Sequence, residues 1–188
     1  MHRLLVPAAA LGLLAALTVP LGAQTAQAGT PIHSAARMAA LDDPTIVAIF
    51  DAANTADIET GDLAAKRGHS PDVRKLGRMF AHDHRAVRQE GRDLAKKLGV
   101  TPTPPKDDKS AAEQAKTMAT LSALHGAAFD KAYLEHEVAF HKAVIDAVTN
   151  TLLPAIQNAE LKALVVKVAP AFQAHMMAAE HLEQQLAK

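Results

Sequence analysis

The stretch TPTPPKDDK, residues 101–109, separates two pairs of predicted helices and decides how these helices are arranged. It cannot form a helix through its prolines, because proline lacks the backbone N–H that a helix needs. The following Ser110-Ala-Ala-Glu113 has the spacing of a capping box and predicts a short helix that ends near Leu124. The whole connection is much longer than a turn between bundle helices. We therefore expect one long crossover that contains a short extra helix and carries the chain back along the bundle.

Four long helices are predicted on the two sides of this crossover. Asp43-Pro44 and Ser70-Pro71 are helix starts, in which a capping side chain precedes a proline at the first helical position. The predicted helices span residues 44–66, 71–98, 127–152 and 157–188. Pro170 lies inside the last helix, where we expect a kink or a local opening. Because no strand-like alternation of useful length occurs, the sequence predicts an all-α fold.

The first 28 residues have the features of a secretory signal peptide. A weakly basic start is followed by an apolar run from Leu4 to Leu21, and Ala26-Gln27-Ala28 is a small-x-small cleavage signal. We expect residues 29–42 to be a flexible leader and residues 43–188 to form the bundle domain. The alternative is a retained membrane anchor, although the apolar run is marginal for crossing about 30 Å. The sequence thus predicts a periplasmic or secreted protein without a stable membrane span after signal cleavage.

Composition excludes several classes of function. The formal net charge is zero and no basic patch occurs, which argues against nucleic-acid binding. The chain has no cysteine, so it has neither a disulfide nor a thiol nucleophile. Hydrolase, phosphate-loop and dinucleotide-binding motifs are absent as well. The sequence identifies no substrate, and it leaves open whether the protein is an enzyme or a homo-oligomer.

Each long helix carries one metal-capable side chain on a stripe of apolar residues spaced by three and four. These four residues are Glu59, His84, His141 and His175. Such spacing places the members of a stripe on one helix face, so all four side chains should face a common core. If the crossover is present, a rise of about 1.5 Å per residue puts all four residues between roughly 10 and 22 Å from the turn that joins the first two helices. Without the crossover, His175 would lie far from Glu59.

Two further residues complete the predicted site. Glu137 lies one turn before His141 on the same face and is a further candidate ligand. Asp83 adjoins His84 and could orient an imidazole through its second nitrogen. A set of imidazoles and carboxylates suits Cu, Zn, Fe or Mn. The alternatives are a metal-free polar network that fixes helix register, and a bis-histidine haem. We expect the other histidines of the bundle domain to be solvated, namely His69, His82, His125, His136 and His181.

Five short stretches of the chain resemble a known family. They are ADIETGDLA at 56–64, MFAHDH at 79–84, FDKAY at 129–133, HKAV at 141–144 and PAFQAH at 170–175. The chain is similar, from about Asp43 to Leu186, to a bacterial extracytoplasmic ferritin-like family catalogued as domain of unknown function four-one-four-two. The resemblance implies a ferritin-like four-helix bundle outside the cytoplasm and no settled activity. It also implies that the polar core set includes Glu59, Asp83, His84, His141 and His175.

The chain departs from the family pattern at two points. Phe140 stands where the family often has an acidic residue before the histidine of the third long helix. No Glu-x-x-His sequence occurs, although ferritin-like di-iron sites use two of them. Di-iron oxygen chemistry and mineral storage are therefore not expected. We expect instead that one transition-metal ion is bound for metal handling or redox stress defence. The alternative is a non-enzymatic envelope protein with a structural polar core.

Overall fold

The structure is a computed structural model that describes residues 41–187, and the predicted signal peptide and most of the predicted leader lie outside these residues. The described part is all-helical, as predicted. Its main helices are α2 (Asp43–Arg67), α3 (Pro71–Leu98), α4 (Ser110–Ser122), α5 (Gly126–Ala147) and α7 (Ala159–Leu186). A π-helical turn, η1 (Val148–Leu152), and the short α6 (Leu153–Ala155) join α5 to α7.

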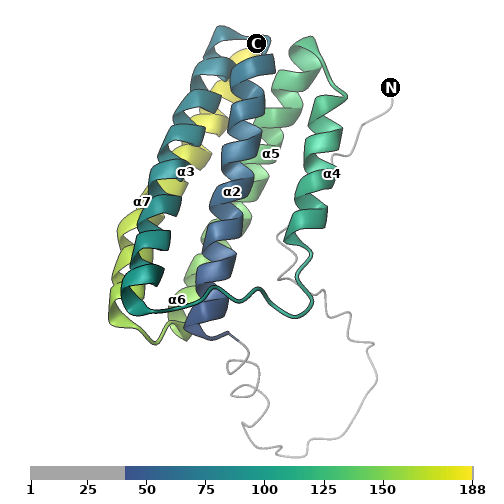
Figure 1. Cartoon of the computed structure of the whole chain (residues 1–188). Helices are drawn as coiled ribbons and strands as arrows, with labels where there is room; N and C mark the ends of the chain where they lie inside the picture. Colours follow the sequence, from purple (N-terminus) through teal and green to yellow (C-terminus); the bar gives the residue numbers. More distant parts are fainter. Residues whose placement is uncertain (1–40, 188) are drawn as a thin grey trace, which may run out of the picture.

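The crossover predicted from the proline-rich stretch is present. α2 and α3 form an antiparallel hairpin, α4 then returns along the side of the bundle, and α5 and α7 form a second hairpin (Figure 1). Arg67 at the end of α2 donates hydrogen bonds to the carbonyls of Ser122 and Leu124, which ties the turn before α5 to the turn before α3. At the opposite end, Asp43 accepts hydrogen bonds from the backbone of Gln157 and Asn158. This arrangement is consistent with a ferritin-like bundle.

Two of the predicted helix caps differ in the structure, whereas the start of α3 is as predicted. The cap of α2 is Asp42 rather than Asp43, so Pro44 takes the second helical position. Asp42 accepts a hydrogen bond from Thr45 N, and Ser70 accepts one from Asp72 N. The predicted capping box at the start of α4 does not form, because Ser110 is already helical and donates its backbone N–H and hydroxyl to Asp108. α7 continues through Pro170, which is exposed, so water can satisfy the carbonyl that proline leaves without a partner.

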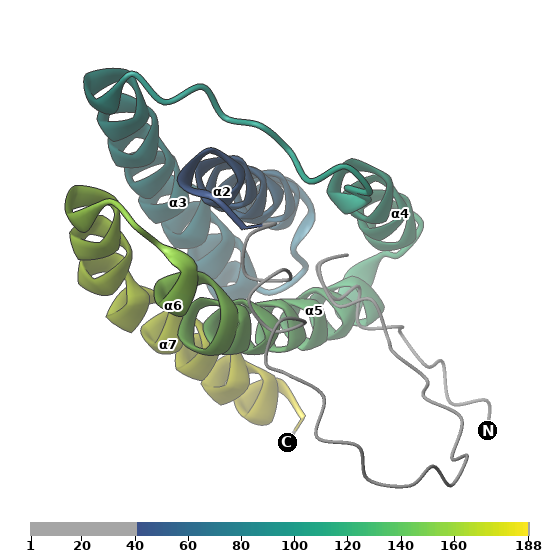
Figure 2. The same cartoon turned by 90° about the horizontal axis from the view of Figure 1, so that it is seen from below.

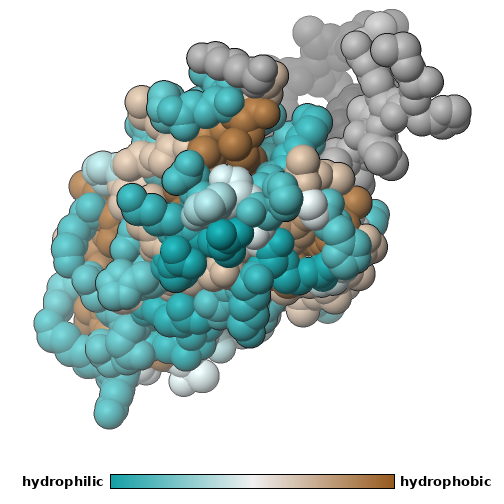
Figure 3. Space-filling view, turned by 90° about the horizontal axis from the view of Figure 1, so that it is seen from above, coloured by the Kyte–Doolittle hydropathy of each residue, from teal (hydrophilic) through white to brown (hydrophobic). Residues whose placement is uncertain are grey.

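Four helices form the bundle and α4 lies outside it. Viewed from below, α4 covers only α2 and α5, on the side away from α3 and α7 (Figure 2). α2 and α3 approach each other closely, since a Cβ at Gly61 would lie 2.8 Å from the carbonyl oxygen of Gly77. The upper end of the molecule is mostly hydrophilic, with a few apolar patches (Figure 3). Among the described residues, no helix is long and apolar enough to cross a membrane.

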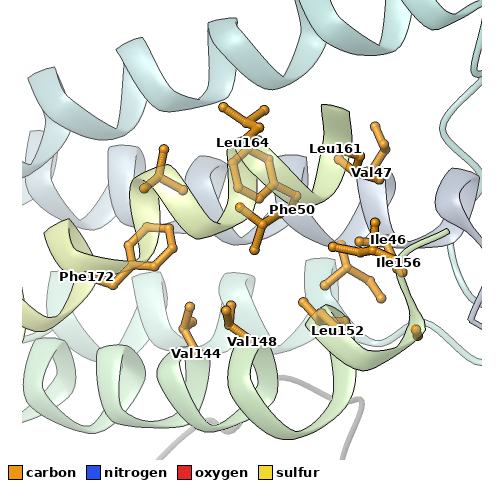
Figure 4. Packing of buried hydrophobic residues seen from close by; sticks show 14 of the residues in the cluster. Ile46, Val47, Phe50, Val144, Val148, Leu152, Ile156, Leu161, Leu164 and Phe172 are labelled. Atoms are coloured by element: carbon orange, nitrogen blue, oxygen red, sulfur yellow. The ribbon is translucent and has the colours of Figure 1, made fainter. Parts of the chain in front are cut away.

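The apolar core is divided into two clusters. One cluster lies near the α5–α7 turn and contains Phe50, Leu152 and Phe172 (Figure 4). The other lies near the α2–α3 turn and contains Phe80 and Phe129. Along each of the four bundle helices, buried polar residues occur between the parts that contribute to the two clusters. The bundle thus has a polar layer between two apolar ones, and this layer holds the candidate site.

Candidate metal centre

Three histidines from three different helices meet in the polar layer. His84 of α3, His141 of α5 and His175 of α7 expose 2%, 0% and 6% of their surface. Each offers a ring nitrogen that lies within 4.8 Å of those of the other two. The structure therefore brings together three of the four side chains that the helical rise per residue predicted at similar heights in the bundle. It does so because the crossover reverses the direction of the last two helices.

The proton positions on His84 follow from its neighbour Asn54. The side-chain amide of Asn54 donates to the carbonyl of Phe50 at 2.8 Å, so its oxygen is turned toward His84. That oxygen lies 2.9 Å from His84 Nδ1, which must therefore carry the hydrogen. In a neutral imidazole the other nitrogen then has a free lone pair. His84 Nε2 consequently presents a lone pair to the centre of the cluster.

His141 is oriented in the same sense by the helix that carries it. Its Nδ1 lies 3.0 Å from the carbonyl oxygen of Glu137, one turn earlier on α5, and can only donate to it. Its Nε2 is buried and has no hydrogen-bond partner among the described residues. A buried polar atom without a partner is costly and calls for an explanation. A bound cation would supply one, because the free lone pair is the form of histidine that binds metal.

His175 completes the group through Asp83. His175 Nε2 lies 3.2 Å from the carboxylate of Asp83, which accepts only, so this nitrogen carries the hydrogen. Asp83 is partly exposed. It contacts a ring nitrogen of a histidine, as predicted, but this histidine is His175 and not the adjacent His84. In the neutral ring, His175 Nδ1 then has a lone pair that faces the lone pair of His84 Nε2 at 3.2 Å. Two lone pairs at this distance repel each other unless a cation or a proton lies between them.

The protonation of the histidines favours the cation. Burial lowers the pKa of His84 to about 2 and that of His141 to about 3, with the neighbouring imidazoles adding to both shifts. Burial also lowers the pKa of His175, against the opposing effect of Asp83. All three rings are therefore neutral near pH 7. Nitrogen ligands about 2.0–2.1 Å from a tetrahedral ion lie roughly 3.3 Å apart, close to the 3.2 Å between His84 and His175.

Two carboxyl groups lie beside the histidines. Asp57 of α2 has an oxygen 3.5 Å from His84 Nε2, and Glu137 of α5 accepts a hydrogen bond of 2.9 Å from Thr60. Asp57, Glu137 and His141 form a second group whose ligand atoms lie within 4.8 Å of one another. Burial raises the pKa of Glu137 to about 7, and it raises the pKa of Asp57 well above its usual value, with the charge of Glu137 adding to the rise. Within the part of the chain that the structure describes, one oxygen of each carboxyl and the hydroxyl of Tyr133 are buried without a hydrogen-bond partner.

The prediction that Glu59 faces the core with the histidines is wrong. Glu59 is exposed and accepts a hydrogen bond of 3.0 Å from Gln114 of α4. The predicted stripe is the face of α2 that α4 covers, whereas the face toward α3, α5 and α7 carries Asn54, Asp57 and Gly61. This second stripe also has helical spacing and includes the buried Phe50, but around Asp57 it carries the small or polar Asn54 and Gly61. Asp57 therefore takes the position expected for Glu59.

Of the histidines expected to be solvated, one is not. His136 exposes only 9% of its surface and lies under α4, while His69, His82, His125 and His181 are exposed as expected. Because α4 covers the flank of α5, a position that looks peripheral in a four-helix bundle is buried here. Glu137 lies in the polar layer next to His141, on the face predicted for it.

The surroundings of the centre are apolar. A pocket of about 30 Å³ borders His84 and Asp57 and is otherwise lined mainly by apolar side chains, including residues of the π-helical turn η1. An apolar shell limits access of water to a site and strengthens its electrostatic interactions.

The comparisons with known proteins assign no activity. No curated protein and no solved structure matches the chain. A family model matches the chain, and the matching region contains all the polar residues that the family resemblance implied for the core. The chain belongs to the family described as Domain of unknown function (DUF4142), which matches residues 28–182.

Proposed function

We propose that the protein binds one transition-metal ion in its polar layer and serves metal handling or redox stress defence outside the cytoplasm. His84, His141 and His175 are the nitrogen ligands, and Asp57 is the fourth donor. The observation that carries the proposal is the inward orientation of the lone pairs. Three hydrogen bonds to other groups fix one nitrogen of each ring as the donor, and the three rings offer nitrogens that lie within 4.8 Å of one another.

The donor set limits the choice of ion. Three imidazoles and one carboxylate suit Zn, Cu or Fe, and Mn less well because it prefers oxygen ligands. When bound, a redox-active ion would supply electron transfer, and Zn would supply a structural or Lewis-acid role. The chain itself orients the ligands through Asn54, Asp83 and the Glu137 carbonyl. Phe80 stacks on the His175 ring with 4.4 Å between the ring centres and holds it in place.

Haem does not fit this site. The ring centres of the three histidines are 5.1 to 5.5 Å apart, and the pocket beside them has a volume of about 30 Å³. A macrocycle between two axial histidines needs far more room than this. The export part of the proposal is supported by the signal-peptide features of residues 1–28 and by nothing in the described residues.

A metal-free polar core is the second candidate, and one observation favours it. A proton on His175 would let both of its nitrogens donate, to Asp83 and to His84 Nε2, at the distances seen. Such a network would fix the register of α3 against α7 without an ion. It leaves His141 Nε2 without a partner, which is why we favour the metal.

The test is metal binding by the purified full chain and by two variants of α3. His84→Ala removes a proposed ligand, and His82→Ala removes an exposed histidine two residues away as the matched control. We expect one equivalent of bound ion in the parent and in His82→Ala, and a loss of affinity of more than about 100-fold in His84→Ala. Equal metal content in the two variants, or a parent that binds no ion tightly, would overturn the proposal in favour of the metal-free network.

A further inference from the structure

A second hollow of the molecule lies outside the bundle core, between α4 and the bundle. It has a volume of about 490 Å³, within the range of roughly 300–1,000 Å³ that small-molecule sites occupy. Residues of α2, α4 and α5 line it, and none of the three histidines of the metal centre is among them. The pocket, which we call the α4 pocket, is therefore a feature separate from the proposed metal site.

The α4 pocket exists because small side chains line its walls. Ala52, Ala53 and Ala56 of α2 face Ala111 and Ala115 of α4 across it, and Phe140 of α5 supplies the one large apolar surface. Alanine makes a wall apolar without filling the space in front of it. α4 is held to α2 partly by polar contacts, such as that of Gln114 with the Ala56 carbonyl and with Glu59. The helix thus covers the pocket without packing into it.

Two buried polar side chains line this space, Thr117 of α4 and His136 of α5, and His136 is the one with a ring nitrogen to offer a ligand. His136 of α5 is nine-tenths buried, and its ring makes no hydrogen bond among the described residues. Its nearest aromatic neighbour is Phe140, with 5.7 Å between the ring centres. A neutral imidazole has one nitrogen that can accept a hydrogen bond. Because His136 lines the pocket, a ligand bound there can supply a hydrogen-bond partner for its ring.

The charges around the α4 pocket have one sign. Asp51, Glu59 and Glu113 line it, and no lysine or arginine does. Asp51 is paired with Arg92, which lies outside the lining. Glu59 and Glu113 are the lining carboxylates that have no cationic partner within residues 41–187. Such a rim attracts a cation and disfavours an anion. Together with the apolar walls, it defines the chemistry of the ligand.

We propose that the α4 pocket binds a cationic amphiphile, such as an alkylamine, with its apolar chain against the alanines and Phe140 and its ammonium group beside Glu59 and Glu113. His136 accepts a hydrogen bond from the ammonium group or from another polar group of the ligand. The site does not depend on the proposed metal centre. A carboxylate with the same chain is the matching ligand that the pocket should reject.

The experiment uses decylamine and decanoate below their micelle concentrations, titrated by calorimetry into the purified full chain. We expect saturable 1:1 binding of decylamine and at least about tenfold weaker binding of decanoate. Ala56→Leu fills the pocket and should weaken decylamine binding at least about tenfold. Ala119→Leu, on an exposed face of α4 outside the lining, is the matched control and should bind like the parent.

The double variant Glu59→Gln/Glu113→Gln separates charge from shape. It should keep the apolar walls but reduce the preference for the amine over the carboxylate. Circular dichroism and thermal unfolding of all variants check that the bundle is intact. Equal binding of the two amphiphiles by the parent would overturn the proposal, and so would unchanged decylamine binding by Ala56→Leu. Either result would mean that the amine adheres to the surface only.

Discussion

The polar layer has two halves that solve the problem of buried polar groups in different ways. In the histidine half, each ring donates one hydrogen bond to a nearby oxygen, which is a side-chain amide, a backbone carbonyl or a carboxylate. The second nitrogen of each ring is therefore free to bind a cation. In the carboxyl half, Asp57 and Glu137 lie together and each has an oxygen without a hydrogen-bond partner. The first half is ready for a cation as it stands. The second half is stable only when it holds a proton or a cation, because two buried carboxylates repel each other.

The largest effect should come from breaking the histidine half. His141→Phe replaces an inward-facing ligand by a ring that can pack with Phe80 and Phe140, which are its aromatic neighbours now. We expect metal affinity to fall by more than about 100-fold, since a ligand is lost rather than merely misoriented. The fold should survive, because a buried nitrogen without a partner is removed together with its cost. Titration with Zn or Cu(II) measures the first effect and thermal unfolding of the metal-free protein the second. Metal binding within a few-fold of the parent would place the ion elsewhere.

The carboxyl half can be tested by the pH dependence of stability in the metal-free protein. The pKa of Glu137 is about 7 in the folded chain, above its ordinary value of 4.5, so the folded state holds a proton that the unfolded state has lost. Its contribution to stability is therefore full below about pH 4.5 and is lost as the pH rises through 7. The shift corresponds to roughly 3 kcal/mol. Asp57→Asn/Glu137→Gln should remove this loss and be more stable than the parent at pH 8.

The buried histidines change the stability of the fold with pH in the opposite direction to the carboxyls. Their pKa values are lowered by burial, so their contribution is present above about pH 6.5 and is lost as the pH falls toward the folded values of about 2 and 3. In the parent the carboxyls offset part of this loss. The double variant lacks the offset, so its stability should fall more steeply between pH 6.5 and 4.5. Urea unfolding at a series of pH values measures both slopes. Parallel curves for the two proteins would show that the carboxyls are not protonated in the fold.

The groups that orient the histidines should have intermediate effects. Asn54→Ala removes the oxygen that fixes the proton on His84, and orienting partners of this kind are worth about 10–100-fold in metal affinity. Asp83→Ala should cost less, because Asp83 is partly exposed and water can replace its contact with His175. The same metal titration ranks the two variants. A larger loss in Asp83→Ala would mean that His84 does not depend on Asn54 for its orientation.

The sequence predicted the helices and the crossover well, because prolines and glycines mark where helices cannot continue. The ends of α2 and α3 fall within one residue of the prediction. The histidines were found since each interrupts a stripe of large apolar residues. Asp57 was missed for the opposite reason: its nearest neighbours at helical spacing are small or polar, namely Ala53, Asn54, Thr60 and Gly61, so hydrophobicity favoured the neighbouring stripe with Glu59. That stripe is apolar because α4 covers it. The periodicity of a single helix cannot predict which face a crossover helix will cover, because this depends on tertiary packing.

The smallest effect should come from Tyr133, whose hydroxyl lies beside the carboxyl half. It is fully buried without a hydrogen-bond partner, and Glu137 and Asp57 raise its pKa in addition to burial. Tyr133→Phe removes the hydroxyl and keeps the ring that stacks with Phe129 at 6.3 Å. If the hydroxyl has no partner, the variant should be as stable as the parent or up to about 1 kcal/mol more stable, with unchanged metal affinity. A loss of more than about 1 kcal/mol would show that the hydroxyl donates to Glu137 in solution. In that case Glu137 has a partner for its second oxygen, and Asp57 Oδ1 is the one carboxyl oxygen of this half that still lacks a partner among the described residues.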